Sequence, residues 1–382
     1  MQKSPLATKV MNYSFWEKKY LESPSDITII GSGIVGLSTA ISIKEKQPWL
    51  TVKVLERGYQ PYGASTKNAG FSCFGSISEL LDDIATMGEE SCAEVVQMRW
   101  KGLKKLKERV GENTLEYKHC GGTEVFHKTE NELKDLCLSK IDFSNDFIKD
   151  TIQLENCFSI RPNTSLREFS ATNIYNAYEG VINPMSMMEA LMQKCHHLSI
   201  QIIYGVEISK IDYTNKILKT TANHQINYHK LILCTNGFTH NLLPNLPVIP
   251  ARNQVLITKP LENNPLTSAY HLDKGYVYFR EYDSRILLGG GRNLDIDVET
   301  TDQFGTTEKI QNYLVQILES ICPGASKEID YWWSGILGIG PTKYPICEWV
   351  DDDVLAGVRL GGMGVAIGSY LGDVLAEKVV HA

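Results

Sequence analysis

The sequence lacks a long apolar run near its start. The opening twenty residues, MQKSPLATKVMNYSFWEKKY, mix charged, polar and apolar side chains throughout. A secretion signal needs an apolar core of about 7–15 residues, and a membrane-spanning helix needs about 20. This segment therefore predicts neither, and we expect no integral membrane segment.

Cysteines are present but form no pattern. The nine cysteines are scattered, and the closest two, Cys120 and Cys137, are 17 residues apart. Neither a C-x-x-C pair nor a zinc-type spacing occurs, and the adjacent His196 and His197 cannot share one face of a helix, so no metal site is expected. An odd set of scattered thiols is typical of reduced cysteines, which favours a cytoplasmic protein.

The sequence carries no excess of positive charge, because its formal net charge is −7. The one basic cluster, Lys101 to Arg109, falls in a stretch that predicts an amphipathic helix ending at Gly111. The apolar residues of that helix recur at helical spacing at Val96, Trp100, Leu103, Leu106 and Val110. The lysines then form its solvated face, so we expect no nucleic-acid partner. The oligomeric state is not indicated.

What the sequence does contain is a strand–turn–helix–strand unit. DITIIGSGIVGLSTA (residues 26–40) has a short buried apolar run followed by G-x-G-x-x-G at Gly31, Gly33 and Gly36. Gly31 permits a tight turn, Gly33 lets the backbone approach a pyrophosphate, and Gly36 lets the helix press against the strand. The next strand, residues 51–55, ends at Glu56, whose carboxylate can bind a ribose diol. Together these features predict dinucleotide binding.

A second glycine-rich segment, GASTKNAGFSCFGS (residues 63–76), favours a flavin over a nicotinamide. A nicotinamide enzyme has no need for a small, polar segment at this point. A flavin dinucleotide is larger, extends past the first domain and needs more backbone to meet it. The sequence therefore predicts FAD as the cofactor.

These segments resemble the D-amino-acid oxidase superfamily of FAD-dependent oxidoreductases, which includes glycine oxidase, sarcosine oxidase and γ-glutamylputrescine oxidase. IIGSGIVGLSTA…VLERG matches the FAD fingerprint, and GASTKNAG matches the second flavin segment, with Lys67 where arginine is commoner. NYSFWEKKY resembles the N-terminal extension of the γ-glutamylputrescine oxidase branch. Later segments that match are CTNGFTHNLLP, YFREYDSRILLGGGR, YWWSGILGIGPTKYPIC and GGMGVAIG.

The resemblance implies an α/β fold (α+β overall), in which an antiparallel-sheet substrate domain is inserted into a doubly wound, Rossmann-type FAD-binding domain. The expected FAD-binding domain is discontinuous and comprises residues 1–95, 171–250 and 331–382. The expected substrate-binding domain comprises residues 96–170 and 251–330. Within the latter, two alternating strands joined at Asp283-Ser284 predict a hairpin.

The resemblance also implies which residues hold the FAD, with the pyrophosphate at the first glycine turn, the ribose at Glu56 and the adenosine against the backbone of Val206. Two departures are visible: Met363 stands where histidine is common, and Cys347 does not match the covalent flavin cysteine of sarcosine oxidases, so we expect noncovalent FAD. The expected cofactor-binding residues are Gly31, Ser32, Gly33, Ile34, Val35, Gly36, Glu56, Arg57, Ala64, Ser65, Lys67, Asn68, Ala69, Gly70, Val206, Thr235, Asn236, Gly237, Gly362, Met363, Gly364 and Val365.

The implied reaction is oxidation of the C–N bond of a small amine or amino acid by hydride transfer to the flavin. The product is an imine that hydrolyses, and oxygen or another carrier accepts the electrons. Such a reaction depends on orientation and a dry site more than on an acid–base set. The substrate-facing candidates are Tyr276, Tyr278, Arg280, Trp333 (or its neighbour Trp332) and Arg359.

Each of these candidates has a structural alternative, which is core packing or, for Arg280, an internal ion pair. In the glycine oxidase branch an arginine clamps the substrate carboxylate, and Leu337 stands at the matching position. Arg359 or Arg280 could replace that clamp. We therefore expect a substrate whose carboxylate is not the main anchor.

Two other functions remain open. Related flavoproteins modify tRNA, although the acidic balance and the lack of a basic groove argue against nucleic acid. A non-catalytic FAD-binding protein would need the same fingerprint, so only turnover separates it from an enzyme.

Overall fold

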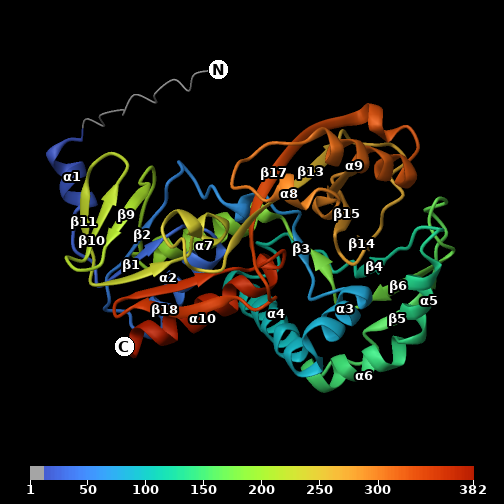
Figure 1. The fold of residues 1–382 in the computed structure, drawn as a ribbon, viewed down its shortest axis with the longest axis horizontal. Helices are drawn as coiled ribbons and strands as arrows, with labels where there is room; N and C mark the ends of the chain where they lie inside the picture. The colour runs from blue at the N-terminus through green and yellow to red at the C-terminus, as the bar shows by residue number, and fades with distance from the viewer. Residues whose placement is uncertain (1–12) are drawn as a thin grey trace.

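The computed structural model describes residues 13–382, which form two halves lying side by side (Figure 1). Part of the expectation about the opening segment falls on residues 1–12, which lie outside the described residues. One half is built on a six-stranded sheet, and the other on an eight-stranded sheet. None of the described helices combines the length and apolar character needed to cross a bilayer.

The six-stranded sheet is parallel apart from one antiparallel edge strand. Its four central strands are short, mainly apolar and almost entirely buried, as expected for a sheet covered on both faces. In spatial order they are β18 (Ile346–Asp351), β19 (Val354–Val358), β12 (Lys230–Leu233), β1 (Ile27–Ile30), β2 (Val52–Leu55) and β8 (Gln201–Ile203).

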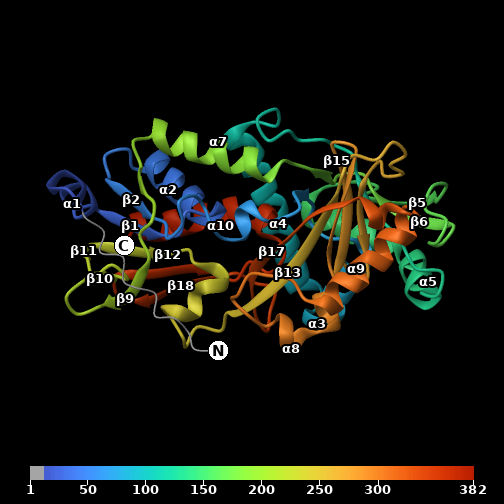
Figure 2. The ribbon, with the colours of Figure 1, turned by 90° about the horizontal axis from the view of Figure 1, so that it is seen from above.

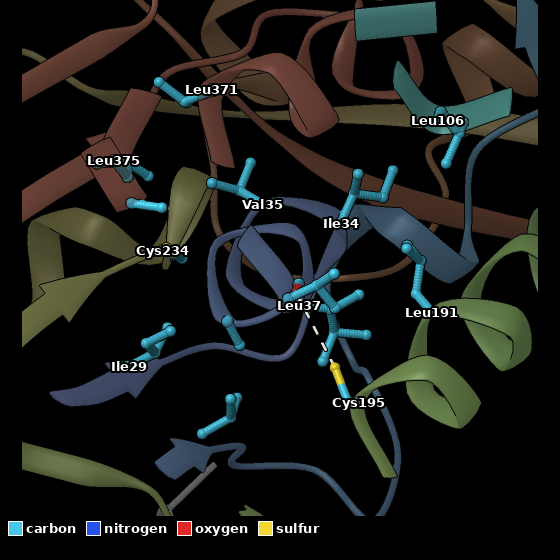
Figure 3. Packing of buried hydrophobic residues seen from close by; sticks show 14 of the residues in the cluster. Ile29, Ile34, Val35, Leu37, Leu106, Leu191, Cys195, Cys234, Leu371 and Leu375 are labelled. Atoms are coloured by element: carbon cyan, nitrogen blue, oxygen red, sulfur yellow. Dashed lines mark hydrogen bonds between the residues drawn. The ribbon is translucent and has the colours of Figure 1, made fainter. Parts of the chain in front are cut away.

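Helices cover one face of this sheet, and a small antiparallel sheet covers the other (Figure 2). The helices are α2 (Ile34–Lys46), α4 (Glu89–Val110), α7 (Pro184–His197) and α10 (Gly364–Val380). The small sheet consists of β9 (Ile208–Asp212), β10 (Ile217–Thr220) and β11 (Gln225–Asn227). In Figure 3, α2 lies at the centre of the helical layer, where Leu37 is surrounded by side chains of its neighbours.

The last helix, α10, packs against both α2 and α4. The contact with α4 is close because Gly102 has no side chain: a Cβ there would lie 1.8 Å from the carbonyl oxygen of Ala366. On the other side, a Cβ at Gly372 would lie 2.6 Å from the Cβ of Ser38 in α2. Small residues therefore let α10 fit between two helices from the first third of the chain.

The eight-stranded sheet is mostly antiparallel and carries α9 (Glu308–Ile321) on one face. Its other face, which we call the inner face, packs against Ala69 and Phe71 through Val255, Leu287, Tyr278 and Trp333. In spatial order the strands are β17 (Ile329–Ile339), β13 (Ile249–Thr258), β16 (Arg285–Gly290), β15 (Val277–Tyr282), β14 (Ala269–Leu272), β4 (Gly122–Glu124), β6 (Thr172–Asn176) and β5 (Phe158–Pro162).

Local predictions agree with these elements. The β15–β16 hairpin turns at Asp283 and Ser284, whose φ values of 51° and 62° suit the tight turns of hairpins. Helix α4 ends at Gly111, as its pattern indicated. The remaining elements are α1 (Phe15–Leu21), α3 (Ile77–Met87), α5 (Asn131–Ser139), α6 (Ile141–Ile152), α8 (Ile296–Glu299), β3 (Phe71–Ser72) and β7 (Gly180–Val181).

Candidate functional site

A cleft that is partly open to solvent lies where the parallel strands β1, β2 and β12 end. Gly31, Glu56 and Cys234 directly follow these three strands and all line the cleft. Ligands of open α/β sheets bind at the carboxyl ends of the strands.

The first glycine turn leaves the N-terminus of α2 open to this cleft. Its N-cap residue, Gly33, offers no side chain to cap the helix. A Cβ at Gly36 would lie 1.9 Å from the carbonyl oxygen of Gly31, so only glycine lets the helix approach the strand so closely. The positive end of the helix dipole therefore faces the cleft, which suits a pyrophosphate.

Glu56 directly follows the last residue of β2, and its buried carboxylate accepts several hydrogen bonds. Its Oε2 accepts hydrogen bonds from the backbone N–H of Ser32 (3.0 Å) and the hydroxyl of Ser32 (2.7 Å). Its Oε1 accepts one from the N–H of Gly58 (2.9 Å). Oε2 already accepts two hydrogen bonds, but Oε1 accepts only one, so Glu56 can still accept a bond from a ribose hydroxyl through Oε1.

We expect Glu56→Gln to weaken FAD binding without abolishing it. The change removes charge-assisted hydrogen bonds around one ribose, which corresponds to a loss on the order of 1–3 kcal/mol. Titration of the apoprotein with FAD measures this. The control is Glu207→Gln, because Glu207 lines the same cleft but is exposed and lies outside the β2 turn. Equal losses for the two variants would contradict a specific role for Glu56.

The second glycine-rich segment, residues 63–76, contacts both the start of α2 in the cleft and the inner face of the eight-stranded sheet. The hydroxyl of Ser65 accepts a hydrogen bond from the N–H of Ile34 at 3.0 Å, at the start of α2. The indole Nε1–H of Trp333 donates to the carbonyl oxygen of Lys67 at 2.9 Å. Burial, together with the charge of Arg57, lowers the pKa of Lys67.

The last glycine turn and the Asn236 loop meet at the far end of the cleft. The side-chain Oδ1 of Asn236 accepts hydrogen bonds from the N–H groups of Arg359 (3.1 Å) and Leu360 (3.3 Å). The two segments are more than a hundred residues apart in the sequence.

The fold brings most of the predicted cofactor residues to one cleft, although their individual roles stay predictions. Those that line it are Gly31, Gly33, Ile34, Val35, Glu56, Arg57, Ala64, Ser65, Asn68, Val206, Thr235, Asn236, Gly237, Gly362, Gly364 and Val365. Those outside the lining are Ser32, Gly36, Lys67, Ala69, Gly70 and Met363.

The substrate-facing candidates lie in different places. Tyr278, Arg280 and Trp333 share the inner face of the eight-stranded sheet, and the Tyr278 hydroxyl accepts a hydrogen bond from Asn253 Nδ2 at 2.9 Å. Tyr276 precedes β15, with its ring 5.3 Å from the guanidinium of Arg292. Arg359 is engaged elsewhere, since its Nε donates to the Tyr344 carbonyl at 3.0 Å.

Sequence reasoning did not assign part of the cleft wall to the cofactor, because its apolar side chains resemble core residues even where they fall within the matched segments. These residues include Cys234, Phe238, Ile336, Leu337 and Leu360. Burial raises the pKa of the Cys234 thiol to about 12, so the thiol is neutral at physiological pH. Cys347, on the edge strand β18, is not part of the lining that the structure describes.

Three side chains of the types that bind metal ions lie together in the structure, although their spacing in the sequence did not indicate a metal site. Cys73, Glu179 and His271 are buried, and their ligand atoms lie within 4.8 Å of one another. His271 Nε2 is 2.7 Å from Glu179 Oε2, and Asn176 Nδ2 donates to the other oxygen of Glu179 at 3.2 Å. Burial acts to lower the pKa of His271, but the Glu179 carboxylate outweighs it and raises the pKa. We interpret the group as a buried ion pair.

The fold and sequence are similar to those of known oxidoreductases. The family described as "FAD dependent oxidoreductase" matches residues 26–378. A protein named "Probable oxidoreductase OrdL" from Haemophilus influenzae is 21% identical, over 93% of this chain and 83% of the relative. L-proline dehydrogenase from P. horikoshii has a TM-score of 0.72 at 17% identity, with 94% of each chain covered. Iminodiacetate oxidase from Chelativorans sp. BNC1 has a TM-score of 0.73 at 18% identity, with 93% of this chain and 95% of that chain covered.

The structural neighbours confirm the predicted fold class, and the family match confirms the resemblance seen in the motifs. The glycine-walled cleft at the N-terminus of α2 fits the dinucleotide that this family uses. The cofactor is FAD, and the chain belongs to the FAD-dependent oxidoreductases of the D-amino-acid oxidase superfamily.

Proposed function

We propose that this protein oxidises the C–N bond of a small amine or amino acid. FAD, when bound, supplies the oxidant that takes the hydride from the substrate carbon. The resulting imine hydrolyses in water, and oxygen or another carrier accepts the electrons. Two structural neighbours support this class by name, since L-proline and iminodiacetate are both nitrogen compounds of this kind.

The observation that carries the proposal is the inner face of the eight-stranded sheet. Val255, Leu287 and Ala69 form a buried cluster there, against which Phe71, Tyr278 and Trp333 pack. Ala69 and Phe71 continue the segment whose Asn68 lines the cofactor cleft. A largely apolar wall excludes water beside the cofactor, which favours hydride transfer from a neutral amine.

The inner face can orient a substrate without an acid–base catalyst. The Trp333 indole bonds to the backbone of the cofactor-binding segment, and the Tyr278 hydroxyl is held by Asn253. Burial raises the pKa of the Tyr278 hydroxyl, which therefore stays protonated. In this proposal residues 1–95, 171–250 and 331–382 bind FAD, and residues 96–170 and 251–330 cover the small-molecule substrate.

The test is anaerobic reduction of the bound flavin, followed by loss of its visible absorbance. The panel pairs each amino acid with the matching amine, such as proline with pyrrolidine and glycine with methylamine, and adds iminodiacetate, sarcosine and polyamines. We expect at least one of these compounds to bleach the flavin. Dithionite serves as the control that the flavin can be reduced.

Two outcomes would contradict the proposal. Reduction by dithionite but by no amine would favour a non-catalytic FAD-binding protein. Reduction by hydroxy compounds, with none by amines, would place the chemistry at a C–O bond.

A further inference from the structure

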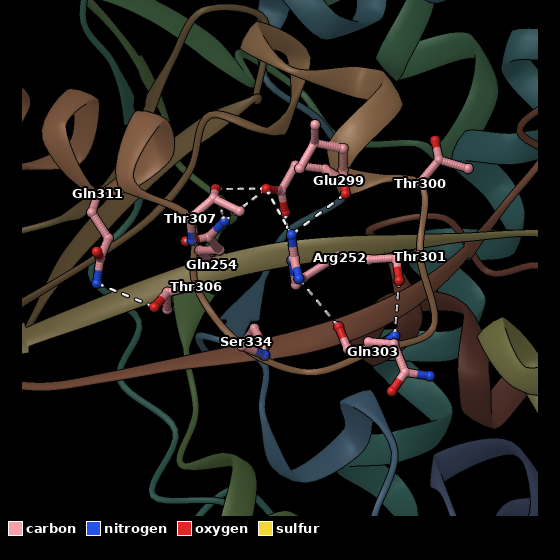
Figure 4. Close-up of polar contacts among 12 residues, drawn as sticks. Arg252, Gln254, Glu299, Thr300, Thr301, Gln303, Thr306, Thr307, Gln311 and Ser334 are labelled. Carbon is pink, nitrogen blue, oxygen red and sulfur yellow. Dashed lines mark hydrogen bonds and ion pairs between the residues drawn. The ribbon is translucent and has the colours of Figure 1, made fainter. Parts of the chain in front are cut away.

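The segment that joins α8 to α9 is a loop whose two ends are fixed at one buried carboxylate. That carboxylate belongs to Glu299, the last residue of α8 (Figure 4). Its Oε1 accepts hydrogen bonds from the Thr307 hydroxyl at 2.8 Å and from Gln254 Nε2 at 2.9 Å. Arg252 donates to both oxygens of Glu299, at 2.8 and 3.1 Å. Residues 300–306, which we call the strap, therefore leave this point and return to it.

The strap runs over the surface of the half that is built on the eight-stranded sheet. The N–H of Gly305 donates to the hydroxyl of Ser334, on β17, at 3.0 Å, and the N–H of Thr307 donates to Gln254 Oε1 at 3.0 Å. Gln303, Gly305 and Thr306 are nevertheless exposed. The strap can therefore move without disturbing the core beneath it.

One side chain of the strap, that of Phe304, reaches the other half of the protein. The centre of its ring lies 5.1 Å from that of Tyr62, which follows β2, and 6.0 Å from that of Phe238, which follows β12. A second contact joins Asp302 Oδ2 to His240 Nε2 at 3.5 Å. The strap thus bridges the two halves through its side chains.

Phe304 lies behind a wall of the cofactor cleft. Phe238 and Arg57 line the cleft, and the guanidinium of Arg57 is 3.7 Å from the centre of the Phe238 ring. Lys67 Nζ is 4.8 Å from the Tyr62 ring and 5.3 Å from the Phe304 ring. Phe304 itself is not part of the lining that the structure describes. Its effect on the cofactor is therefore exerted through the residues that it packs against.

We propose that the strap closes over the cofactor cleft and must lift before FAD can enter or leave. The anchor at Glu299 confines the movement to residues 300–306. Phe304 holds the strap down through its ring contacts with Tyr62 and Phe238, which are weak enough to break and re-form. This role concerns retention of the cofactor and holds for any substrate that the flavin oxidises.

The test measures two rates by flavin fluorescence: association of FAD with the apoprotein, and dissociation of FAD from the loaded protein. We expect Phe304→Ala to raise both rates by about tenfold, because it removes the two aromatic pairs that keep the strap closed. Phe143→Ala is the matched control. Phe143 also stacks on a second ring, that of Phe147, but it lies on α6 and does not line the cleft, so both rates should stay unchanged.

Gly305 allows a second test that removes no side chain. Its φ is +133°, which L residues rarely adopt, and a Cβ there would meet nothing within 4 Å. Gly305→Ala therefore strains the closed strap without a clash and should raise both rates by about threefold or more. Gly324→Ala is the matched control, because its φ is +87° and its surroundings are also open, but it lies beyond the far end of α9 and outside the cleft lining.

The two rates together distinguish a moving strap from a fixed wall. Faster dissociation with unchanged association in Phe304→Ala would make the ring a fixed part of the cofactor site and would overturn the proposal. Unchanged rates in either variant, or equal changes in Gly305→Ala and Gly324→Ala, would overturn it as well. If Phe304→Ala does not fold, Gly305→Ala decides alone.

Discussion

Replacing Gly33 with valine should give a protein that purifies without flavin. A Cβ at this position would lie 2.9 Å from the Ser65 hydroxyl, which accepts the hydrogen bond from Ile34 at the start of α2. The two further methyl groups of valine would occupy space where the backbone must approach the pyrophosphate. We expect FAD affinity to fall by roughly 4 kcal/mol or more, about a thousandfold.

FAD content per chain after acid precipitation measures this effect. The wild type should release yellow FAD into the supernatant, and the Gly33→Val variant should release almost none. Gly324→Ala is the control for a lost glycine, because position 324 does not line the cleft; a Cβ there meets open space, and its φ of +87° makes the change cost backbone strain away from the cofactor. Full flavin content in Gly33→Val would show that this turn is not the phosphate site, and a yellow pellet from the wild type would show covalent attachment.

Replacing Arg99 with methionine should cost about 3–5 kcal/mol of unfolding free energy. Arg99, on α4, lies 3.4 Å from Glu79 and 3.7 Å from Asp83, both on α3, and donates to the Phe74 carbonyl at 2.9 Å. Lys343, from the loop after β17, also pairs with both carboxylates. Burial works against ionisation of Glu79, but Arg99 and Lys343 outweigh it and lower its pKa. Without Arg99, two buried carboxylates share one lysine.

The midpoint of urea unfolding, measured on the FAD-saturated protein, reports this loss of unfolding free energy. Arg167→Met is the matched control, because Arg167 is exposed and should change stability by less than about 0.5 kcal/mol. The double variant Arg99→Met/Glu79→Gln should recover part of the loss, since one of the stranded charges is gone. An unfolding midpoint for Arg99→Met equal to that of Arg167→Met would contradict the prediction. It would mean that water or Lys343 stabilises the two buried carboxylates without Arg99.

The parts of the fold that the sequence predicted are those set by neighbouring residues. The unit from β1 to Glu56 spans about thirty residues, and its apolar runs and glycines act within a few positions of one another. The β15–β16 hairpin likewise depends on Asp283 and Ser284, whose backbone conformation decides the turn. Such features need no knowledge of the rest of the chain.

The rest could not be predicted because it depends on contacts between distant segments. Strand β12 pairs with β19, which lies more than a hundred positions later in the sequence. Nothing in the sequence of either strand indicates which strand it will pair with. The cleft wall includes Ile336 and Leu360, whose apolar side chains look like any core residue. The Arg99 cluster could not be predicted either, because a charged residue in a sequence does not reveal what surrounds it in the fold.

The position of α10 and β19 has a consequence for how the protein is made in the cell. The cofactor fingerprint leaves the ribosome early, but the sheet behind it lacks β19, and α2 lacks its neighbour α10, until residues 354–380 have emerged. At about 5–20 residues per second, the nascent chain exposes the apolar surface of β12 and α2 for tens of seconds. The flavin half can therefore close only after α10 has emerged, and a chain that stops before residue 354 cannot complete it.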